Sequence, residues 1–361
     1  MKLKKLTTAL ILGSTVFGGI AMANQSATVI EVPAQTIQLT QEWDKVFPKS
    51  DKVEHRKVTF KNRFGITLAA DVYMPKNATG KLPAIAVAGA FGAVKEQISG
   101  LYAQTLAERG FITVAFDPSY TGESSGLPRN MPSPDINTED FSAAVDFLGT
   151  LDNVDREKIG ALGICGWGGF VLNAAINDPR IKAVATSTMY DMTRVSAKGY
   201  NDSIDAEGRY KMRQEINAGR WKAMKNDYAD LLPANNLRFE QITADTPLFI
   251  KEYGDYYATS RGFHSRAANS NPDGSWATTG FLGLINLPIL QYANELRTPA
   301  LIVHGENAHS RYFSEDAFKA LGSQDKELYI VKGATHVDLY DDKAGKIPYD
   351  KFEAFFKAKL N

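Results

Sequence analysis

Cysteine is almost absent from this sequence, which also lacks a net charge and, beyond its first residues, any long apolar run. One of the 361 residues is cysteine, Cys165, so an intramolecular disulfide is excluded. Basic and acidic side chains number 41 each, a balance that provides no electrostatic footprint for nucleic acid or anionic lipid. The hydrophobic content of 44% excludes an extended low-complexity chain and indicates a globular core.

The first 23 residues have the pattern of a secretory signal peptide. Three lysines occur within the first five residues, residues 6–20 are mostly apolar, and Ala21-Met22-Ala23 has the small-x-small form of a cleavage site. We therefore expect an exported protein, periplasmic or secreted, whose mature chain begins at Asn24 and keeps 38 of the 41 basic residues, for a formal charge of −3. The alternative is an uncleaved membrane anchor, which the shortness of the apolar run disfavours. No cysteine directly follows that run, so lipoprotein anchoring is excluded.

Strand and helix patterns alternate over most of the remaining chain. After a polar lead-in at residues 24–52, residues 53–60 and 65–73 predict two antiparallel strands joined by a short turn. The predicted elements that follow are strand 84–88, helix 96–109, strand 111–116, helix 138–148, strand 159–164, helix 168–176, strand 181–187, strand 300–303, helix 314–321, strand 328–331 and helix 349–360. Such alternation indicates βαβ units in a mostly parallel sheet with helices on both faces, an α/β fold.

Residues 190–292 interrupt this alternation. They carry an amphipathic helical signal at 206–230 and an aromatic-rich segment after it. Length alone is compatible with two domains or with one α/β domain that has an insertion. We interpret residues 53–189 and 293–361 as one core and residues 190–292 as an inserted cap.

Cys165 lies between an apolar strand and a glycine-rich helix start. The segment reads Gly163-Ile164-Cys165-Gly166-Trp167-Gly168-Gly169. A strand, a tight turn and a helix form the setting of a nucleophile elbow, which needs small residues because the backbone of the nucleophile is strained. A thiol there faces the helix N-terminus, whose partial positive charge favours the thiolate. We predict that Cys165 is a nucleophile, and the alternative is a buried core cysteine.

Two further side chains with suitable chemistry follow later strands. His336 comes directly after the last predicted strand, where its loop can bring the imidazole over the sheet as a general base. Glu306 is the single carboxylate in the loop after strand 300–303 and would orient the imidazole of His336. The chain order nucleophile, acid, histidine is that of one established triad arrangement. The alternative places Glu306 in solvent and the acid elsewhere, with Asp338 as the next candidate.

Backbone amides complete the expected site. The amides of Gly166 and Phe91 would form an oxyanion hole, with Phe91 in the loop after strand 84–88. The alternative is an ordinary turn between a strand and a helix. His264, in the cap, is expected to contact substrate. Structural roles are expected for Asp117, His55, His304 and His309.

With these segments in order, the chain resembles the α/β-hydrolase superfamily, in particular its dienelactone-hydrolase-like branch with a cysteine at the nucleophile elbow. The resemblance covers most of residues 53–360, and the segments at 92–97 and 122–124 are similar to those of a widespread bacterial group. Two residues depart from the pattern. Gly89 stands where relatives often have histidine, and Trp167 stands where the elbow has a small residue. We expect the Trp167 indole to form a wall of the substrate pocket, the alternative being a displaced helix start.

The predicted activity is cleavage of a carboxylic ester, lactone or thioester through an acyl-cysteine intermediate. No metal or organic cofactor is implied. The expected partner is a small-molecule substrate, and no binding to nucleic acid, or to a membrane after signal cleavage, is expected. The sequence does not indicate the oligomeric state. One alternative is transfer of the acyl group to an alcohol or amine by the same residues. Another is a non-catalytic ligand-binding protein on a hydrolase scaffold. The aromatic residues of the cap indicate either an apolar acyl group or a core of the cap itself.

Overall fold

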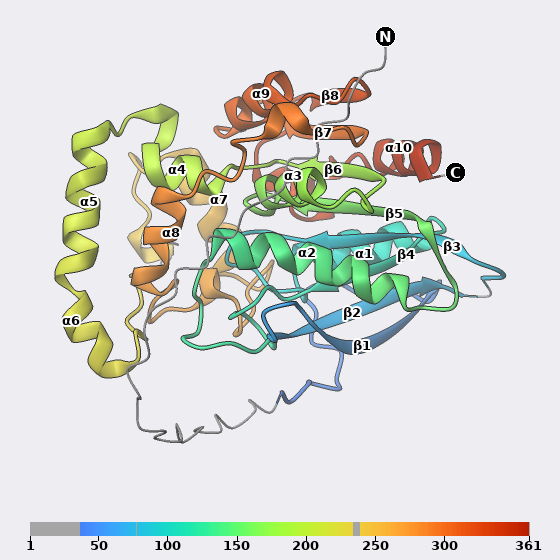
Figure 1. The fold of residues 1–361 in the computed structure, drawn as a ribbon, viewed down its shortest axis with the longest axis horizontal. Coiled ribbons are helices and arrows are strands. Elements are labelled where there is room, and N and C mark those ends of the chain that lie inside the picture. The colour runs from blue at the N-terminus through green and yellow to red at the C-terminus, as the bar shows by residue number, and fades with distance from the viewer. Residues whose placement is uncertain (1–36, 77, 234–238, 361) are drawn as a thin grey trace, which may run out of the picture. The chain divides into compact units, whose positions relative to one another are not determined.

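The computed structural model describes residues 37–76, 78–233 and 239–360 (Figure 1). The expected signal peptide, its cleavage site and the start of the mature chain lie outside these residues. The described residues belong to a single unit, Thr36–Asn361. None of their helices is both long and apolar enough to cross a membrane.

An eight-stranded sheet forms the centre of the molecule. Its strands are β1 (Val53–Lys61), β2 (Thr67–Pro75), β3 (Leu82–Ala88), β4 (Ile112–Phe116), β5 (Val154–Ile164), β6 (Ala183–Ser187), β7 (Ala300–Gly305) and β8 (Lys326–Val331). Their spatial order is β1-β2-β4-β3-β5-β6-β7-β8. Strand β2 pairs antiparallel with β1 and β4, and every other pair is parallel. The predicted entry hairpin and parallel sheet are therefore confirmed.

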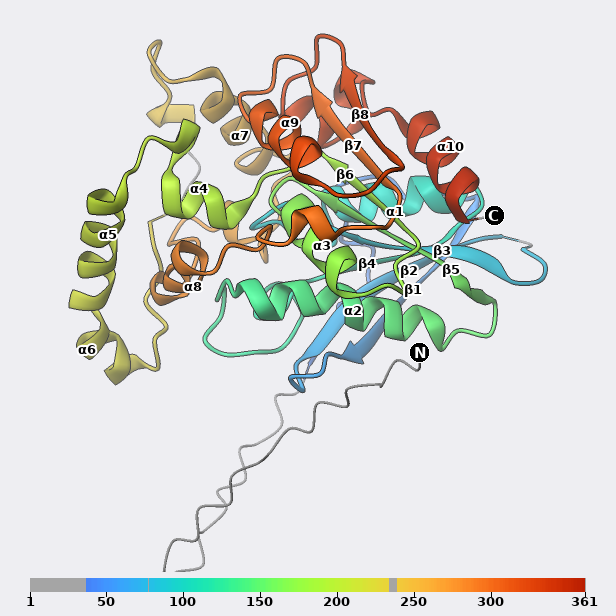
Figure 2. The same cartoon turned by 45° about the horizontal axis from the view of Figure 1, so that its top comes forward.

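Helices cover both faces of the sheet. They are α1 (Ile98–Glu108), α2 (Pro134–Gly149), α3 (Trp167–Asn177), α9 (Arg311–Ala320) and α10 (Tyr349–Leu360). Helices α1 and α10 pack on one face, and α2, α3 and α9 pack on the other (Figures 1 and 2). Successive residues of β3 alternate between the two apolar clusters, with Ala86 in one and Val87 in the other. Residues 84–88 of β3 and all positions of β4 are buried, which explains why these segments are nearly continuous apolar runs.

The chain leaves the sheet between β6 and β7 and forms an insertion, residues 188–299. Its helices are α4 (Met192–Lys198), α5 (Ala206–Ala218), α6 (Arg220–Ala223), α7 (Leu248–Tyr257) and α8 (Phe281–Asn286), with short 3₁₀ turns between them. Helices α5 and α6 lie farthest from the sheet (Figure 1), and α5 has no buried residue. Helix α7, in contrast, buries Tyr256 and Tyr257 against the core. The insertion thus combines an outlying helical part with a part that packs on the sheet.

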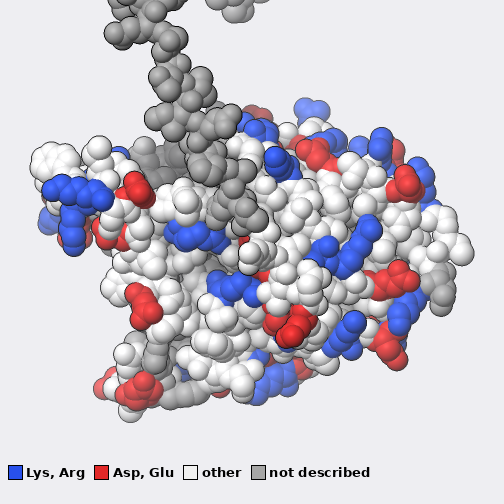
Figure 3. All heavy atoms as spheres, turned by 90° about the horizontal axis from the view of Figure 1, so that it is seen from below, with Lys and Arg blue, Asp and Glu red and all other residues white. Residues whose placement is uncertain are grey.

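Charged side chains are mixed over the surface of the molecule drawn in Figure 3. Lysine and arginine side chains alternate there with aspartate and glutamate side chains. Binding of a polyanion needs basic residues that gather on one face. The face in Figure 3 offers no such patch.

Candidate active site

Cys165 occupies the turn between β5 and α3, at the carboxyl edge of the sheet. Its φ angle is +54°, in the left-handed region that residues other than glycine rarely adopt. The turn is tight, because a Cβ atom on Gly163 would lie 2.2 Å from the carbonyl oxygen of Trp167. The backbone of Cys165 is held by its amide, which donates to the carbonyl of Ser187 at 2.9 Å. The geometry is therefore that of a nucleophile elbow.

Two backbone amides are directed at the Cys165 thiol. One belongs to Gly166 and the other to Phe91, in the loop after β3. The insertion holds that loop in place, because Asn269 Nδ2 donates to the Phe91 carbonyl at 2.7 Å. The Phe91 ring also stacks on Trp276, with ring centroids 4.0 Å apart. The structure thus brings together the thiol and the two amides that the sequence analysis selected.

His336 is fully buried in the loop after β8. Its Nε2 atom lies 3.1 Å from the hydroxyl oxygen of Tyr340. The same tyrosine lines one cavity with Cys165 and lowers the pKa of its thiol by hydrogen bonding. Within the described part of the chain, no hydrogen bond joins the thiol directly to the imidazole. Tyr340 therefore connects the two groups that the sequence analysis assigned as nucleophile and base.

Hydroxyl groups occupy the other side of the His336 ring. Its Nδ1 atom lies 2.6 Å from Ser310 Oγ and 2.9 Å from Thr188 Oγ1. Ser310 Oγ is in turn 2.9 Å from His304 Nε2, and His304 Nδ1 is 2.6 Å from Ser314 Oγ. Ser314, His304, Ser310 and His336 are all fully buried, and we call them the hydroxyl–imidazole chain. Hydroxyl oxygens therefore hold the ring at the position where a triad has a carboxylate.

The carboxylates considered for that position point elsewhere. Glu306 Oε2 accepts from the amide of Gly333 at 2.8 Å and is exposed, whereas His336 is buried. Glu306 is the first residue after β7, where the chain turns outward, while Ser310 lies farther along the loop and folds back over the sheet. Asp338 pairs with Lys346 at 2.8 Å. Neither carboxylate contacts the imidazole, so the geometry does not give Glu306 the orienting role expected of it.

Burial keeps the groups of this site uncharged at rest. Burial raises the pKa of the Cys165 thiol, although hydrogen bonds from Tyr340 and from the two amides act in the opposite direction. Burial also places the pKa of His336 well below its ordinary value, and His309 and His304 lower it further. The thiolate expected from the helix N-terminus is therefore not favoured here, because desolvation outweighs the hydrogen bonds that would stabilise it. A proton must leave the thiol during the reaction itself.

A cavity of about 360 Å³ opens onto the thiol. Its lining residues are Phe91, Cys165, Tyr190, Met192, Val195, Ile250, Tyr253, Tyr257, Asn269 and Tyr340. Both the core and the insertion contribute to this lining. None of these described residues is charged, so the cavity suits a neutral, largely apolar group.

Trp167 and His264 do not line this cavity. The Trp167 indole is 1% exposed and packs on Phe141 and Phe170 in the core, with ring centroids 5.9 and 5.1 Å apart. The expected pocket wall is therefore wrong. The displaced helix start is wrong as well, because α3 begins at Trp167 itself and the ring belongs to the apolar cluster of the core. His264 is buried away from the cavity and accepts a hydrogen bond from the amide of Arg266 at 3.3 Å. Its expected contact with substrate is not made in this arrangement.

The position of Trp167 leads to a test. Trp167→Phe should lower the free energy of unfolding by about 1–3 kcal/mol, because the smaller ring leaves part of the core unfilled. The ranking of short and bulky acyl substrates by kcat/KM should stay unchanged. Met192→Ala is the matched comparison, since Met192 lines the cavity, and it should alter the ranking. A changed ranking in the Trp167 variant would restore the role of pocket wall.

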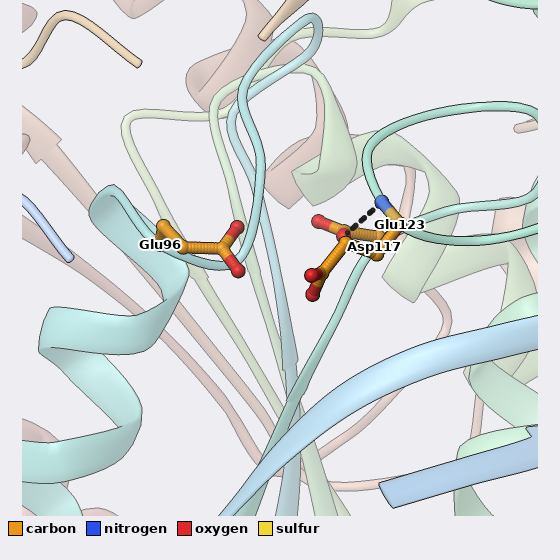
Figure 4. A group of neighbouring side chains, drawn as sticks. All are labelled: Glu96, Asp117 and Glu123. Carbon is orange, nitrogen blue, oxygen red and sulfur yellow. Dashed lines mark hydrogen bonds between the residues drawn. The ribbon is translucent and has the colours of Figure 1, made fainter. Parts of the chain in front are cut away.

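A buried cluster of charged side chains lies close to the Phe91 loop. The carboxylates of Glu96, Asp117 and Glu123 point toward one another (Figure 4), and oxygen atoms from the three lie within 4.8 Å of each other. Such oxygens are suitable ligands for a divalent cation. The ammonium group of Lys95 already lies among them, 2.6 Å from Glu96, 2.9 Å from Asp117 and 2.6 Å from Glu123. The Lys95 cluster therefore contains a cation supplied by the chain itself.

Sequence analysis missed three of the groups around His336, namely Tyr340, Ser310 and Thr188, and gave His304 a purely structural role. A signal for Tyr340 was present, because it follows His336 by four residues across a helical turn, where side chains share one side. The hydroxyl groups carried no such local signal. Serine and threonine are common in loops, and only the folded chain shows which of them meet an imidazole.

Comparison with known proteins agrees with this geometry. Residues 65–338 match the family described as X-Pro dipeptidyl-peptidase (S15 family). The chain belongs to this family. The uncharacterized protein PA2218 of Pseudomonas aeruginosa is 58% identical over 326 residues, which cover 90% of this chain and 86% of that relative. The crystal structure of PA2218 has a TM-score of 0.84, at 57% identity, and covers 90% of this chain and 100% of that one.

Two more distant comparisons bear on fold and chemistry. The thiohydrolase aneE of Aspergillus aculeatus is 32% identical over 135 residues, 37% of this chain and 42% of that relative. The α/β hydrolase GrgF from Penicillium sp. sh18 has a TM-score of 0.65 at 22% identity, covers 85% of this chain and 99% of that one, and shows the fold alone. The predicted α/β-hydrolase fold is therefore confirmed, and the chain is placed among hydrolases. The dienelactone-hydrolase-like branch stays a prediction.

Proposed function

We propose that this S15-family protein cleaves a carboxylic ester, lactone or thioester through an acyl intermediate on Cys165. The observation that carries the proposal is a thiol at a strained elbow with the amides of Gly166 and Phe91 directed at its sulfur. An acyl carbonyl bonded to that sulfur has its oxygen close to both amides, where negative charge develops during acyl transfer. A cysteine that only fills the core needs neither a strained backbone nor two amides directed at its sulfur.

The proposed reaction proceeds in two steps. The Cys165 sulfur attacks the carbonyl carbon while the thiol proton is taken up by the site, with His336 as the final acceptor. The two amides bind the oxyanion. When it collapses, the bond to the leaving alcohol or thiol breaks and His336 returns the proton to that group. Water then attacks the acyl-cysteine, His336 accepts a proton from the water, and the acid and the free thiol are formed.

The cavity lining supports a neutral acyl group. A peptide amino terminus is positively charged at neutral pH, and burying it requires a paired carboxylate. The described lining of the cavity has no acidic residue but does have aliphatic side chains such as Met192, Val195 and Ile250. This favours an ester or thioester over a peptide substrate, although the family is named after a peptidase. The partial similarity to the thiohydrolase aneE supports a thioester in particular.

Acyl transfer to an alcohol or amine uses the same residues and differs only in which nucleophile reaches the acyl-cysteine. The two outcomes separate experimentally when the acyl-enzyme is formed with p-nitrophenyl butyrate and then mixed with buffer alone or with added alcohol. We propose hydrolysis, so the added alcohol should not accelerate deacylation.

We further propose that the chain is exported. The support is the basic start, the apolar run and the cleavage pattern of residues 1–23.

His336→Ala should lower kcat for p-nitrophenyl butyrate by a factor on the order of 10² to 10⁴, because the site loses its proton acceptor. Glu306→Ala is the matched control and should stay close to wild type, since its carboxylate binds the Gly333 amide and not the imidazole. Steady-state kinetics of both variants measure the difference. If Glu306→Ala is as inactive as His336→Ala, a carboxylate orients the base during the reaction and the hydroxyl groups do not suffice.

A further inference from the structure

We propose that Tyr340 is a catalytic residue that carries the proton from the Cys165 thiol to His336. The inference rests on the proposed function, in which Cys165 is the nucleophile. The Tyr340 hydroxyl lies 3.1 Å from Nε2 of His336, and Tyr340 lines the same cavity as the Cys165 thiol, whose pKa it lowers by hydrogen bonding. It is thus in contact with both the group that must lose a proton and the group that must gain one.

Other tyrosines surround the same cavity without this double contact. The hydroxyl of Tyr190 is hydrogen-bonded to His309 and lies 3.3 Å from the hydroxyl of Tyr253. Among the described tyrosines, only Tyr340 has a hydroxyl hydrogen-bonded to both the thiol and the imidazole of His336. The geometry therefore singles out one phenol.

The ring of Tyr340 is held rigidly where the relay needs it. It is 1% exposed, and its centroid lies 5.3 Å from that of Tyr256 and 6.1 Å from that of Tyr257. Burial places the pKa of Tyr340 well above its ordinary value, so the phenolate is not available as a base. A phenol that stays neutral can pass a proton on only while it receives another. A buried neutral phenol can therefore act as a proton relay but not as a general base.

The relay balances in protons and charge. The thiol proton moves to the phenol oxygen of Tyr340 while the phenol's own proton moves to Nε2 of His336. The sulfur of Cys165 keeps the electron pair and forms the bond to the carbonyl carbon. Tyr340 ends neutral, and the imidazole becomes positively charged. When the oxyanion collapses, the imidazolium gives its proton to the Tyr340 oxygen while the phenol's own proton passes to the leaving alcohol or thiol, and the sulfur keeps its bond to the acyl carbon.

The hydroxyl–imidazole chain sets the direction of this relay. For Nε2 of His336 to accept a proton, Nδ1 must carry one, which it donates to Ser310 Oγ. Ser310 can accept this bond because its own hydroxyl donates to Nε2 of His304. With hydroxyls in place of a carboxylate, the imidazolium is only weakly stabilised. A concerted relay through Tyr340 avoids a separate, long-lived thiolate–imidazolium pair.

The test uses Tyr340→Phe, which removes the hydroxyl and keeps the ring. Acylation of the whole protein by p-nitrophenyl butyrate is followed in a single turnover as the burst of nitrophenolate, in mixtures of H₂O and D₂O. In the wild type we expect the rate to depend on the deuterium fraction along a curve, because two protons move in one step. In Tyr340→Phe the rate should fall on the order of 10²-fold and depend linearly on that fraction.

Tyr256→Phe is the matched control, because Tyr256 is buried against the Tyr340 ring but lies outside the cavity lining. It should keep the wild-type rate and curvature. If Tyr340→Phe does not fold, replacement of Tyr340 by 3-fluorotyrosine tests the same step, since it lowers the pKa of the phenol with almost no change in shape. The acylation rate should then shift severalfold with the curvature retained.

The outcomes separate this inference from the proposed function. A Tyr340→Phe variant that acylates at the wild-type rate, or more slowly with the wild-type curvature, overturns the relay and leaves Cys165 as nucleophile. An unchanged rate with 3-fluorotyrosine overturns it as well. A wild-type protein that turns over the ester without any acyl group on Cys165, as shown by peptide mass, overturns the proposed function and the relay with it.

Discussion

Cys165→Ala should abolish turnover of esters and thioesters and leave the fold intact. The elbow then has no atom that can bond to the acyl carbon, whereas the two amides stay in place. Removing one sulfur from this buried position costs about 1–3 kcal/mol of stability. Turnover of p-nitrophenyl butyrate and a thermal melt followed by circular dichroism measure the two effects. Full activity in this variant would exclude the acyl-cysteine mechanism.

Cys165→Ser is the more demanding form of the same experiment. A serine hydroxyl has a much higher pKa than a thiol and needs stronger help from a base. The base here is a neutral imidazole whose Nδ1 contacts hydroxyl oxygens and no carboxylate in the described structure. We expect partial or no activity. Wild-type turnover by the serine variant would indicate a stronger base than the structure contains.

Lys95→Met should cost the protein about 3–5 kcal/mol of stability, because it leaves the buried carboxylate of Asp117 without its ammonium partner. Glu96 and Glu123, in contrast, keep Arg266 and Lys57. The Lys95 side chain is 0% exposed, and it bonds Glu96, Asp117 and Glu123. Burial raises the pKa of Glu123, but the charge and hydrogen bond of Lys95 bring it down to about 2. Methionine keeps an unbranched chain that is one heavy atom shorter than that of lysine and carries no charge. Urea unfolding at pH 7 measures the loss.

The pH dependence of this loss provides a second readout. Burial already raises the pKa of Asp117, and loss of the ammonium raises it further above that of the unfolded chain, so the folded variant binds more protons than the unfolded one as the pH falls. The stability deficit of Lys95→Met should therefore shrink between pH 7 and about pH 5. Lys319→Met is the control, since Lys319 is exposed and should change stability by less than about 0.5 kcal/mol. A variant as stable as wild type would mean that the cluster contributes little to the fold.

Local features of the sequence were enough to predict the sheet and the elbow. The apolar runs of β3 and β4 are buried on both faces, and consecutive apolar residues in the sequence indicate this burial. The turn at Cys165 depends on glycines within a few positions of it, because a side chain at Gly163 has no space beside Trp167. The proximity of Cys165 to the Phe91 amide was also predictable from the sequence, since the two loops follow neighbouring parallel strands, β5 and β3.

The sequence by itself thus determined the order of elements, the parallel sheet and the place of the thiol, because each follows from spacing along the chain. Only the tertiary structure decided which side chains surround His336. Glu306 and Ser310 lie in one loop. The loop turns back toward the sheet between them, so the Glu306 carboxylate lies in solvent and the Ser310 hydroxyl contacts the imidazole of His336. Burial, which no local pattern measures, made the thiol and the imidazole neutral and left Tyr340 between them.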